Sequence, residues 1–384
     1  MRKIKLAYVV TNCKKTGPIQ QTLNLLRYLD RGAFETFLVT LWPEEPDNTL
    51  LEEYRALGVP IFSAGLSRAQ SILQGRRAVG RILRQSGPDI VHAVGMPPYR
   101  MTLGWRQGVH LTTLRNDCPA DYPDQYGRWI GPALARLDLR LIRHQAARGE
   151  PFVVCSESLR QIYRTRCGLD FPCICNGVEL GLWPEAGPDR TALRARLGLP
   201  EEKVLFVYGG GFIQRKNQQE AIEGFLKMEG RAGAALVLLG DGPDLEPLRR
   251  TFGEAKGVLF PGRVTNVSDY LRASDIYLTT SRSEGLPNGV LEAMACGLPV
   301  LASDIPQHRE ALAPDPGCGW LYPLGRPDQL AAAMDRVLRA DQAEMGRRAG
   351  QVARSCFSAQ RMSREYQALY RKLIPQNPSE RSRE

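Results

Sequence analysis

The segment 281–301 constrains the fold of this chain more than any other part of its sequence. Glu284 follows an apolar run of β type, residues 275–280, and Glu292 lies eight residues further on, within a pattern of helical spacing. Pro287 suits the first position of that helix, because the N–H that proline lacks would have no partner there, and Gly297 suits its end. A second apolar run follows at 299–302. Strand, loop, helix and strand in this order predict a parallel sheet with a ligand at the carboxyl ends of its strands.

The start of the predicted helix favours an anion, whereas the two glutamates favour hydroxyl groups. The backbone N–H groups of Asn288, Gly289 and Val290 have no partner within the helix, and with the helix dipole they attract negative charge. A carboxylate accepts hydrogen bonds from hydroxyls and can receive both members of a diol. The pattern therefore predicts a ligand that carries both phosphate and hydroxyl groups, and a sugar nucleotide fits that description.

The same stretch resembles the Glu-x7-Glu donor signature of the retaining glycosyltransferases of family 4. Several other segments resemble motifs of that family in the expected order, and the resemblance as a whole covers roughly residues 4–372, specific in the second half and looser in the first. These segments are Pro88-Asp-Ile-Val-His92, Val154-Cys-Ser156-Glu-Ser158-Leu159, Asn176-Gly-Val-Glu179, Val207-Tyr-Gly-Gly-Gly211 with Gln214-Arg-Lys216-Asn217, Leu238-Leu-Gly240-Asp-Gly242-Pro, Phe260-Pro-Gly262-Arg-Val264 and Tyr270 to Asp275. A single Glu-x7-Glu pair is common on surface helices, whereas an ordered series is specific.

The resemblance assigns roles to individual residues. It implies that Glu284 contacts the donor sugar and is catalytic, that Glu292 holds the ribose hydroxyls, and that Lys216 binds the donor diphosphate. Arg115 would add a fixed positive charge near the donor phosphate or an anionic acceptor. The donor-binding set comprises Gly17, Gly211, Arg215, Lys216, Arg263, Val264, Glu284, Gly285, Leu286, Pro287, Asn288 and Glu292.

The chain departs from the family pattern at two of these positions. Gly211 stands where the family usually has an arginine, and either Arg215 or Arg282 could compensate. Arg115 stands where the family usually has a histidine, and a structural arginine paired with Asp117 or Asp121 is an equally good interpretation. For His92, we favour a satisfied histidine at a strand end over a residue of the site.

The expected architecture is α/β: two Rossmann-like, doubly wound domains that face one another across a cleft, which is the GT-B arrangement of the resembling family. We expect an acceptor-side domain at 1–175, a linker at 176–190, a donor domain at 191–357, a helix at 358–374 that returns to the first domain, and a disordered tail at 375–384. Strands are predicted at 4–10, 34–41, 59–63, 89–94, 109–114, 151–155, 203–208, 234–239, 257–260, 275–279 and 298–302, and helices in the first half at 18–30, 49–57, 68–86, 97–107 and 125–148.

Positive charge is concentrated in the first half. Residues 1–179 hold 24 Lys and Arg against 16 Asp and Glu, so they carry +8 of the chain's net +10. No helix-turn-helix, zinc-finger or aromatic ribonucleoprotein pattern accompanies it, which argues against nucleic acid. An anionic membrane surface or a lipid-diphosphate acceptor explains the asymmetry, and an ordinary solvated basic surface explains it as well. The oligomeric state is not indicated.

The sequence predicts neither a metal nor a cofactor besides the UDP- or GDP-sugar substrate. The four histidines form no cluster, and the nine cysteines lack zinc or redox spacing. No run reaches the roughly 18 apolar residues of a membrane helix, and no signal peptide precedes the first strand. We therefore expect a cytoplasmic protein, with the inner face of the cytoplasmic membrane as a peripheral location.

The predicted function is transfer of a hexose from a nucleotide sugar, with retention of anomeric configuration and without a metal. The glycan or lipid-linked acceptor would belong to bacterial surface polysaccharide synthesis: capsule, O-antigen, lipopolysaccharide or exopolysaccharide. Two alternatives stay open. One is a weakly active relative that binds sugar nucleotides as a partner subunit, and the other is a UDP-sugar epimerase of the same architecture.

Overall fold

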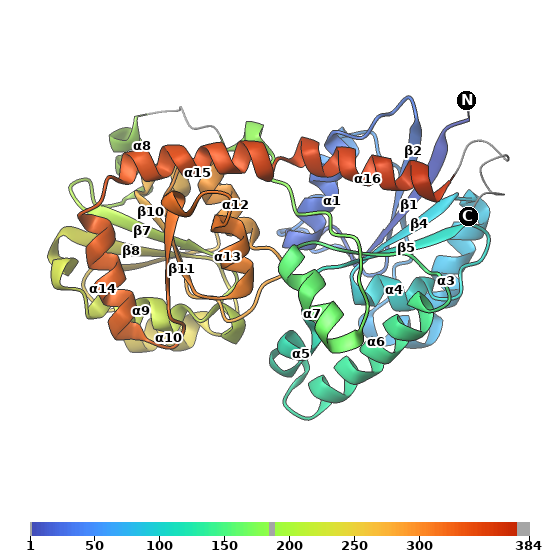
Figure 1. The fold of residues 1–384 in the computed structure, drawn as a ribbon, viewed down its shortest axis with the longest axis horizontal. Helices are drawn as coiled ribbons and strands as arrows, with labels where there is room; N and C mark the ends of the chain where they lie inside the picture. The colour runs from blue at the N-terminus through green and yellow to red at the C-terminus, as the bar shows by residue number, and fades with distance from the viewer. Residues whose placement is uncertain (1, 184–188, 375–384) are drawn as a thin grey trace. The chain divides into compact units, whose positions relative to one another are not determined.

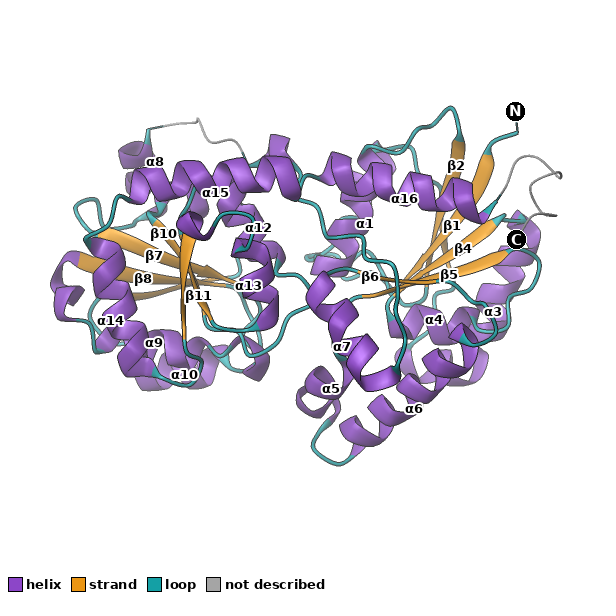
Figure 2. Cartoon of the chain, in the orientation of Figure 1, coloured by secondary structure: helices purple, strands orange, loops and turns teal. Residues whose placement is uncertain are grey.

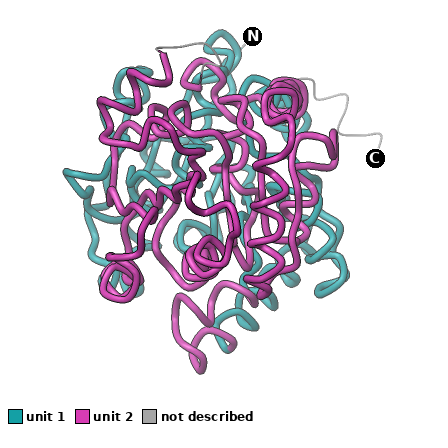
Figure 3. The backbone as a smooth tube through the Cα atoms, turned by 90° about the vertical axis from the view of Figure 1, so that its left-hand side faces the viewer, with its two compact units in different colours: residues 1–118, 133–177, 359–384 teal, residues 119–132, 178–358 magenta. Residues whose placement is uncertain are grey.

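The computed structural model describes residues 2–183 and 189–374, and the chain divides into two compact units. Unit 1 comprises Met1–Cys118, Ala133–Gly177 and Ala359–Glu384, and unit 2 comprises Pro119–Pro132 and Val178–Ser358 (Figures 1 and 3). Part of the predicted linker, 184–188, and the predicted tail, 375–384, lie outside the described residues. The segment 119–132, which the sequence placed within the first domain, clusters with unit 2.

Unit 1 is built on a six-stranded parallel sheet in the order β3-β2-β1-β4-β5-β6. Its strands are β1 (Ile4–Val10), β2 (Phe34–Thr40), β3 (Ile61–Ser63), β4 (Ile90–Val94), β5 (Val109–Leu114) and β6 (Phe152–Val154). The helices that follow these strands in the chain are α1 (Gly17–Arg27), α2 (Leu51–Ala56), α3 (Arg68–Ser86), α4 (Met96–Thr102), α5 (Cys118–Tyr126), α6 (Ile130–Ala146) and α7 (Glu157–Cys167). Of these, α5 lies almost entirely in the segment 119–132, which clusters with unit 2. Helix α5 was not predicted as a separate element, because the predicted helix at 125–148 ran through the break between α5 and α6.

The final helix, α16 (Ala359–Leu373), belongs to unit 1 and packs on α1. Its Tyr370 hydroxyl lies 2.8 Å from both the Tyr8 hydroxyl and His92 Nδ1, and its Tyr366 hydroxyl lies 3.0 Å from Thr113 Oγ1. His92 Nε2 meets Thr113 Oγ1 at 2.7 Å, so both ring nitrogens have partners. Burial lowers the pKa of His92 to about 3. His92 is therefore a neutral histidine of the core, and the predicted helix at 358–374 completes that core.

Unit 2 repeats the architecture with the strand order β12-β11-β10-β7-β8-β9, again all parallel. Its strands are β7 (Val204–Gly209), β8 (Ala234–Leu239), β9 (Val258–Gly262), β10 (Ile276–Thr279), β11 (Val300–Ser303) and β12 (Gly319–Tyr322). The helices are α8 (Arg190–Leu197), α9 (Gln218–Leu226), α10 (Leu245–Phe252), α11 (Val267–Ala273), α12 (Asn288–Ala295), α13 (Pro306–Leu312), α14 (Pro327–Leu338) and α15 (Gln342–Cys356), with 3-10 turns η1 (Leu180–Leu182), η2 (Gln214–Lys216), η3 (Glu229–Gly233) and η4 (Pro316–Cys318).

Helices cover both faces of the sheet in unit 2. Helices α9 and α14 pair on one face, and α12 and α15 pair on the other (Figure 2). Consequently the central strands are buried on both sides, and β8 is buried at every position. Strand β12 was not predicted because Gly319-Trp-Leu-Tyr322 is short and follows a Pro-Gly-Cys turn, so no alternation is visible in the sequence.

The strand order places a topological switch in each sheet. In unit 2 the chain starts at β7, moves outward through β8 and β9, and then returns to β10 on the other side of β7. Loops that leave the carboxyl ends of β7 and β10 therefore diverge and leave room for a ligand between them. Lys216 follows β7 and Glu284 follows β10, so the fold brings these two predicted residues to one place.

Glycines allow the loops after β7 and β8 to approach closely. Gly240 has a φ of +135°, and a Cβ there would lie 1.9 Å from the carbonyl oxygen of Gly210. The Phe212 N–H donates to the Asp241 carbonyl at 2.9 Å and ties the two loops together. Any side chain at position 240 would force the loop that leads to Lys216 away from its position.

We predict that Gly240→Ala destabilises unit 2 by about 2–4 kcal/mol, because the substitution combines an unfavourable φ with a backbone clash. The measurement is the urea unfolding midpoint. Gly233→Ala is the matched control, since a Cβ at Gly233 would have no atom within 4 Å. Equal midpoints for the two variants would contradict the prediction.

Candidate donor site

The segment after β7 presents Lys216 through a tightly held turn. Asn217 has a φ of +55°, the one positive φ of a non-glycine residue in the described part of the chain. The Tyr208 hydroxyl donates to the Lys216 carbonyl at 2.5 Å, and the Thr280 hydroxyl donates to the Asn217 carbonyl at 2.7 Å. The main chain beneath Lys216 is thus held from β7 and from the end of β10 together.

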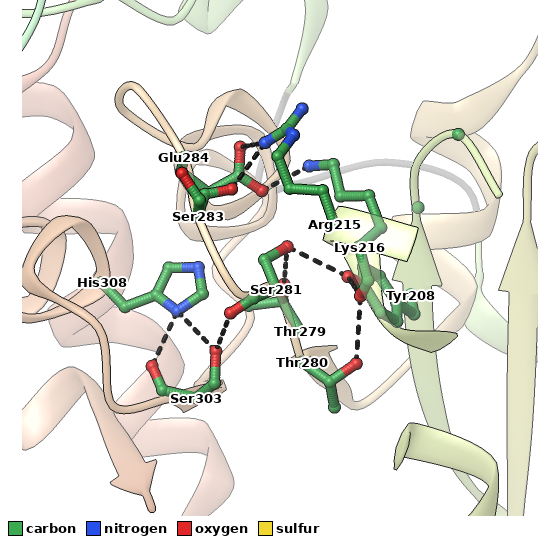
Figure 4. A network of polar contacts seen from close by, with 12 residues as sticks. Tyr208, Arg215, Lys216, Thr279, Thr280, Ser281, Ser283, Glu284, Ser303 and His308 are labelled. Atoms are coloured by element: carbon green, nitrogen blue, oxygen red, sulfur yellow. Dashed lines mark hydrogen bonds and ion pairs between the residues drawn. The ribbon is translucent and has the colours of Figure 1, made fainter. Parts of the chain in front are cut away.

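The loop after β10 carries Glu284 and is held by a chain of hydroxyl groups. Ser281 Oγ lies 3.1 Å from the Tyr208 hydroxyl, and Ser303 Oγ on β11 donates to the Ser281 carbonyl at 2.6 Å (Figure 4). The Ser283 hydroxyl donates to an Asp121 carboxylate oxygen at 2.9 Å. The loop is therefore fixed on several sides before it reaches Glu284.

Glu284 is a buried carboxylate held between two cations. Lys216 Nζ lies 2.5 Å from one carboxylate oxygen and Arg215 NH1 lies 2.9 Å from the other, while the glutamate side chain is only 8% exposed. Arg215 also donates to the Ser283 carbonyl at 2.6 Å. Burial alone would raise the pKa of Glu284, but the charges of Lys216 and Arg215 outweigh it and hold that pKa well below its usual value.

Glu292 has the opposite environment although it belongs to the same motif. It lies on α12, is partly buried, and within the described residues its carboxylate receives no hydrogen bond or ion pair. Burial raises its pKa to about 7, against a smaller lowering effect of Lys216. Because a carboxyl without hydrogen bonds is costly in a buried position, Glu292 is suited to receive donors from a ligand.

The helix start differs from the prediction by one residue. Pro287 has an extended ψ of 101° and precedes α12, and its carbonyl accepts from the Val290 and Leu291 N–H groups. The predicted first helical position was therefore wrong: the helix begins at Asn288, because Pro287 serves as the cap. Gly289 cannot be replaced easily, since a Cβ there would lie 2.3 Å from the Tyr277 hydroxyl.

The remaining predicted donor residues of unit 2 flank this centre. Gly285 and Leu286 lie between Glu284 and the cap, and Asn288 is the first residue of α12. Gly211 is exposed and follows β7, whereas Arg263 and Val264 follow β9, where Arg263 lies 3.6 Å from Asp241. At Gly211 a Cβ would meet only the Asp241 carbonyl, at an ordinary 3.7 Å. Arg215, rather than Arg282, provides the second cation at Glu284.

Gly17 and Arg115 belong to unit 1. Gly17 is the first residue of α1, directly after the extended cap Thr16 at the switch-point end of β1. Arg115 follows β5 and donates to Asn176 Oδ1 at 2.8 Å. It pairs with neither Asp117, which binds Arg166, nor Asp121, which accepts from Ser283, so the structural pairing predicted for Arg115 was wrong. Its partner is instead the asparagine of the Asn-Gly-Val-Glu turn.

Sequence reasoning missed three residues of this centre. Tyr208 was noted only as part of the Val207–Gly211 segment, and Asp121 only as a possible partner of Arg115, while its actual partner Ser283 is 162 positions away. His308 lies on α13, fully buried next to Ser303. The sequence assigned none of the three a role in the site, because each contributes through contacts between distant segments. Within the described residues, no group of three or more His, Cys, Asp or Glu is arranged to hold a metal ion.

Two family models match the chain, one on each half. "Glycosyltransferase Family 4" matches residues 17–182, and "Glycosyl transferases group 1" matches residues 189–355. The chain belongs to glycosyltransferase family 4. Its two six-stranded α/β units are the fold class called GT-B. Among the described residues, no helix is both long and apolar enough to cross a membrane.

Individual relatives are distant. N-acetyl-alpha-D-glucosaminyl L-malate synthase of Bacillus anthracis is 28% identical over 47% of this chain, and the match spans 49% of that relative's length. UDP-Gal:alpha-D-GlcNAc-diphosphoundecaprenol alpha-1,3-galactosyltransferase of Escherichia coli is 24% identical over 87% of this chain and 88% of its own. The Anabaena HepE structure in complex with UDP and glucose is 16% identical, covers 96% of this chain and 100% of its own, and has a TM-score of 0.76.

We predict that Glu292→Gln removes a pH dependence of stability. A glutamate whose folded pKa is raised from 4.5 to about 7 stabilises the fold below pH 4.5, and this contribution is lost as the pH rises towards 7. Relative to the variant, the natural chain should lose about 2 kcal/mol of unfolding free energy between pH 5 and pH 8. Urea unfolding at the two pH values measures it, with exposed Glu254→Gln as the control. A constant difference between the natural chain and Glu292→Gln would disprove the assignment.

Proposed function

We propose that the protein transfers a hexose from a nucleotide-diphosphate sugar to a glycan or lipid-linked acceptor, with retention of configuration. The observation that carries the proposal is the Glu284 carboxylate held between Lys216 and Arg215 at the switch point of unit 2. Two cations, a helix start and a carboxyl without partners converge there, which are the groups that a nucleotide sugar requires.

The proposed chemistry needs positive charge where the leaving phosphate gains negative charge. Lys216 and Arg215 supply it, together with the amino end of α12, and a resident metal is not part of the proposal. Glu292 receives the ribose hydroxyls. Glu284 contacts the sugar ring and stabilises its positive charge, while the leaving phosphate accepts the acceptor's proton on the same face.

The position of Arg215 bears on the alternative that the protein is a weakly active relative that only binds sugar nucleotides. That alternative arose because Gly211 replaces the arginine usual in the family. In this chain Arg215 already reaches the Glu284 carboxylate, so a second cation lies next to Lys216 without Arg at 211. This supports an active donor site over a binding partner subunit. Arg115 stays a predicted positive charge toward the donor phosphate or an anionic acceptor.

The comparisons support a nucleotide-sugar donor and a bacterial glycan product. The E. coli relative is named for UDP-Gal and a diphosphoundecaprenol acceptor, and a 32% identical relative from Bacillus subtilis, matched over 39% of this chain, is named for teichuronic acid biosynthesis. HepE binds UDP and glucose. We therefore propose UDP- or GDP-sugars as donors, a polysaccharide or lipopolysaccharide precursor as acceptor, and a cytoplasmic location.

The test of the proposal is a screen of UDP-, GDP- and ADP-sugars for binding by thermal shift and for slow hydrolysis, run in excess EDTA. We expect one donor class to bind and to be hydrolysed without added metal. Binding without any turnover would favour the partner subunit. Recovery of turnover only on addition of magnesium would overturn metal independence, and epimerised sugar as product would favour an epimerase.

We predict that substitutions of the two glutamates of the motif have different effects on nucleotide binding and turnover. Glu292→Ala should weaken nucleotide binding at least 10-fold, because the ribose contact is made in the ground state and the transition state alike. Glu284→Ala should keep most of the nucleotide affinity and lower kcat at least 100-fold, because the sugar contact gains strength in the transition state. Calorimetry with the nucleotide and turnover of the donor measure the two effects.

Glu284→Gln is the companion variant, since it retains a hydrogen-bonding side chain between Lys216 and Arg215 and guards against misfolding. Near-normal turnover in both Glu284 variants would show that this residue is not catalytic.

We further propose that unit 1 associates with an anionic lipid surface through α3. Ile72 and Leu73 on this helix are 79% and 83% exposed, next to exposed arginines at 76, 77, 81 and 84. An apolar pair flanked by cations matches a negatively charged membrane interface. The exposed apolar pair adds to the charge asymmetry that the sequence already indicates.

Neutralising Arg76, Arg77, Arg81 and Arg84 together should reduce binding to vesicles that contain anionic lipid, without changing donor affinity. In the natural chain this binding should fall as salt rises, because the attraction is screened within about 10 Å at 0.1 M ionic strength. Vesicle flotation measures it. Neutralising the exposed Arg250, Lys256, Arg326 and Arg336 of unit 2 removes the same charge and serves as the control. Equal losses in both variants would assign the effect to net charge, and no binding by the natural chain would point to a soluble acceptor.

A further inference from the structure

His308 is a buried titratable residue with no role in the proposed function so far. It lies on α13, its side chain is fully buried, and its Nδ1 is 2.8 Å from the Ser303 carbonyl oxygen and 3.2 Å from Ser303 Oγ (Figure 4). Ser303 in turn donates to the Ser281 carbonyl in the loop that carries Glu284. The histidine is therefore attached to the same loop as the central carboxylate.

The contact with Ser303 determines the tautomer of the ring. A carbonyl oxygen only accepts hydrogen bonds, so Nδ1 carries the hydrogen and donates it. In the neutral ring, Nε2 is then a bare acceptor. This atom is buried and has no hydrogen-bond partner in the described part of the chain. A buried acceptor without a partner is unfavourable and indicates a state in which it gains one.

The charged groups around His308 are Glu284 on the β10 loop, Lys216 on η2 and Asp304 next to Ser303. The free ring nitrogen points toward the loop of Ser283 and Glu284 in Figure 4. Burial lowers the pKa of His308 to about 4, while Glu284 acts to raise it and Lys216 to lower it. The pKa of His308 therefore depends on where Lys216 and Arg215, the two cations that contact Glu284, lie.

We propose that His308 is a positioning residue for Glu284. When a nucleotide diphosphate draws Lys216 and Arg215 away from Glu284, His308 takes up a proton from solvent at Nε2 and pairs with the carboxylate. This inference rests on the proposed function of the donor site. Glu284 cannot stay as a buried anion without a cation, particularly beside the negative charges of a diphosphate. A protonated His308 would replace the positive charge that Glu284 loses and would hold the Glu284 carboxylate toward the sugar.

The arrangement also explains why the displacement of Lys216 from Glu284 and the protonation of His308 occur together. Removal of Lys216 from Glu284 takes away a charge that disfavours the imidazolium, and the phosphates add charges that favour it. Donor binding should therefore raise the pKa of His308, so that the ring takes up a proton between pH 5 and pH 8, where the ring of the free chain is neutral. Glu292, with its pKa of about 7, also titrates in this range, so a measurement specific to histidine is required.

The experiment is nitrogen-15 NMR of the histidine side chains in the full chain, which contains only 4 histidines. Spectra are recorded between pH 5 and pH 8, free and saturated with UDP or GDP, and His308→Asn assigns the resonance. We expect the free chain to show the neutral ring with hydrogen on Nδ1. With nucleotide, the ring should instead become protonated and titrate within this pH range.

Donor hydrolysis gives an independent readout. His308→Gln can still donate to Ser303 but cannot take up a proton, so we expect kcat to fall about 10-fold with little change in donor KM. The loss of kcat that follows deprotonation of His308 as the pH rises should disappear in this variant. His144→Gln is the control, because His144 is exposed on α6 of unit 1. A fall in thermal stability with an unchanged pH profile would mean a purely structural role and would overturn the inference.

The outcomes separate the two proposals. If UDP or GDP binds and the His308 resonance does not shift, this inference fails and the donor site stands. If neither nucleotide binds, the proposed function fails and this inference with it.

Discussion

The ion pairs of Glu284 with Lys216 and Arg215 are the interaction on which the candidate site depends. A buried carboxylate is tolerated only when charge and hydrogen bonds compensate it, and here two cations from η2 meet one acid from the β10 loop. The hydroxyl groups of Tyr208 and Thr280 hold the main chain beneath the cations. The site is therefore organised by its own charges.

The two glutamates of the motif show how the environment shifts the pKa of chemically identical groups in opposite directions. Eight residues apart, Glu284 is held ionised by adjacent cations, whereas burial without partners raises the pKa of Glu292 to about 7. Opposite shifts in neighbouring carboxyls are typical of functional sites. The difference arises from the loop and helix that carry them, since Glu284 can reach η2 and Glu292 lies along α12.

Two buried histidines, His92 on β4 and His308 on α13, illustrate the same contrast in the two units. His92 has partners on both ring nitrogens, and its low pKa reflects a core position beneath α16. His308 has a partner on one nitrogen and a bare acceptor on the other. Burial is common to both residues, so the unsatisfied atom rather than the pKa distinguishes the candidate for function.

The sequence by itself determined the parallel α/β architecture, the strands that flank the site, and the assignment of Lys216 and Glu284 to the loops after two of those strands. Buried parallel strands leave continuous apolar runs, and loops at their carboxyl ends carry recognisable glycine and helix-start patterns, so these features are encoded locally. Short β12 and the break between α5 and α6 left no such periodicity. Only the tertiary structure decided that Arg215 joins Lys216, that Arg115 binds Asn176, and that His308 lies beneath the Glu284 loop. These contacts join residues far apart in the chain, and which partner a charged side chain takes depends on distances that spacing along the sequence does not specify.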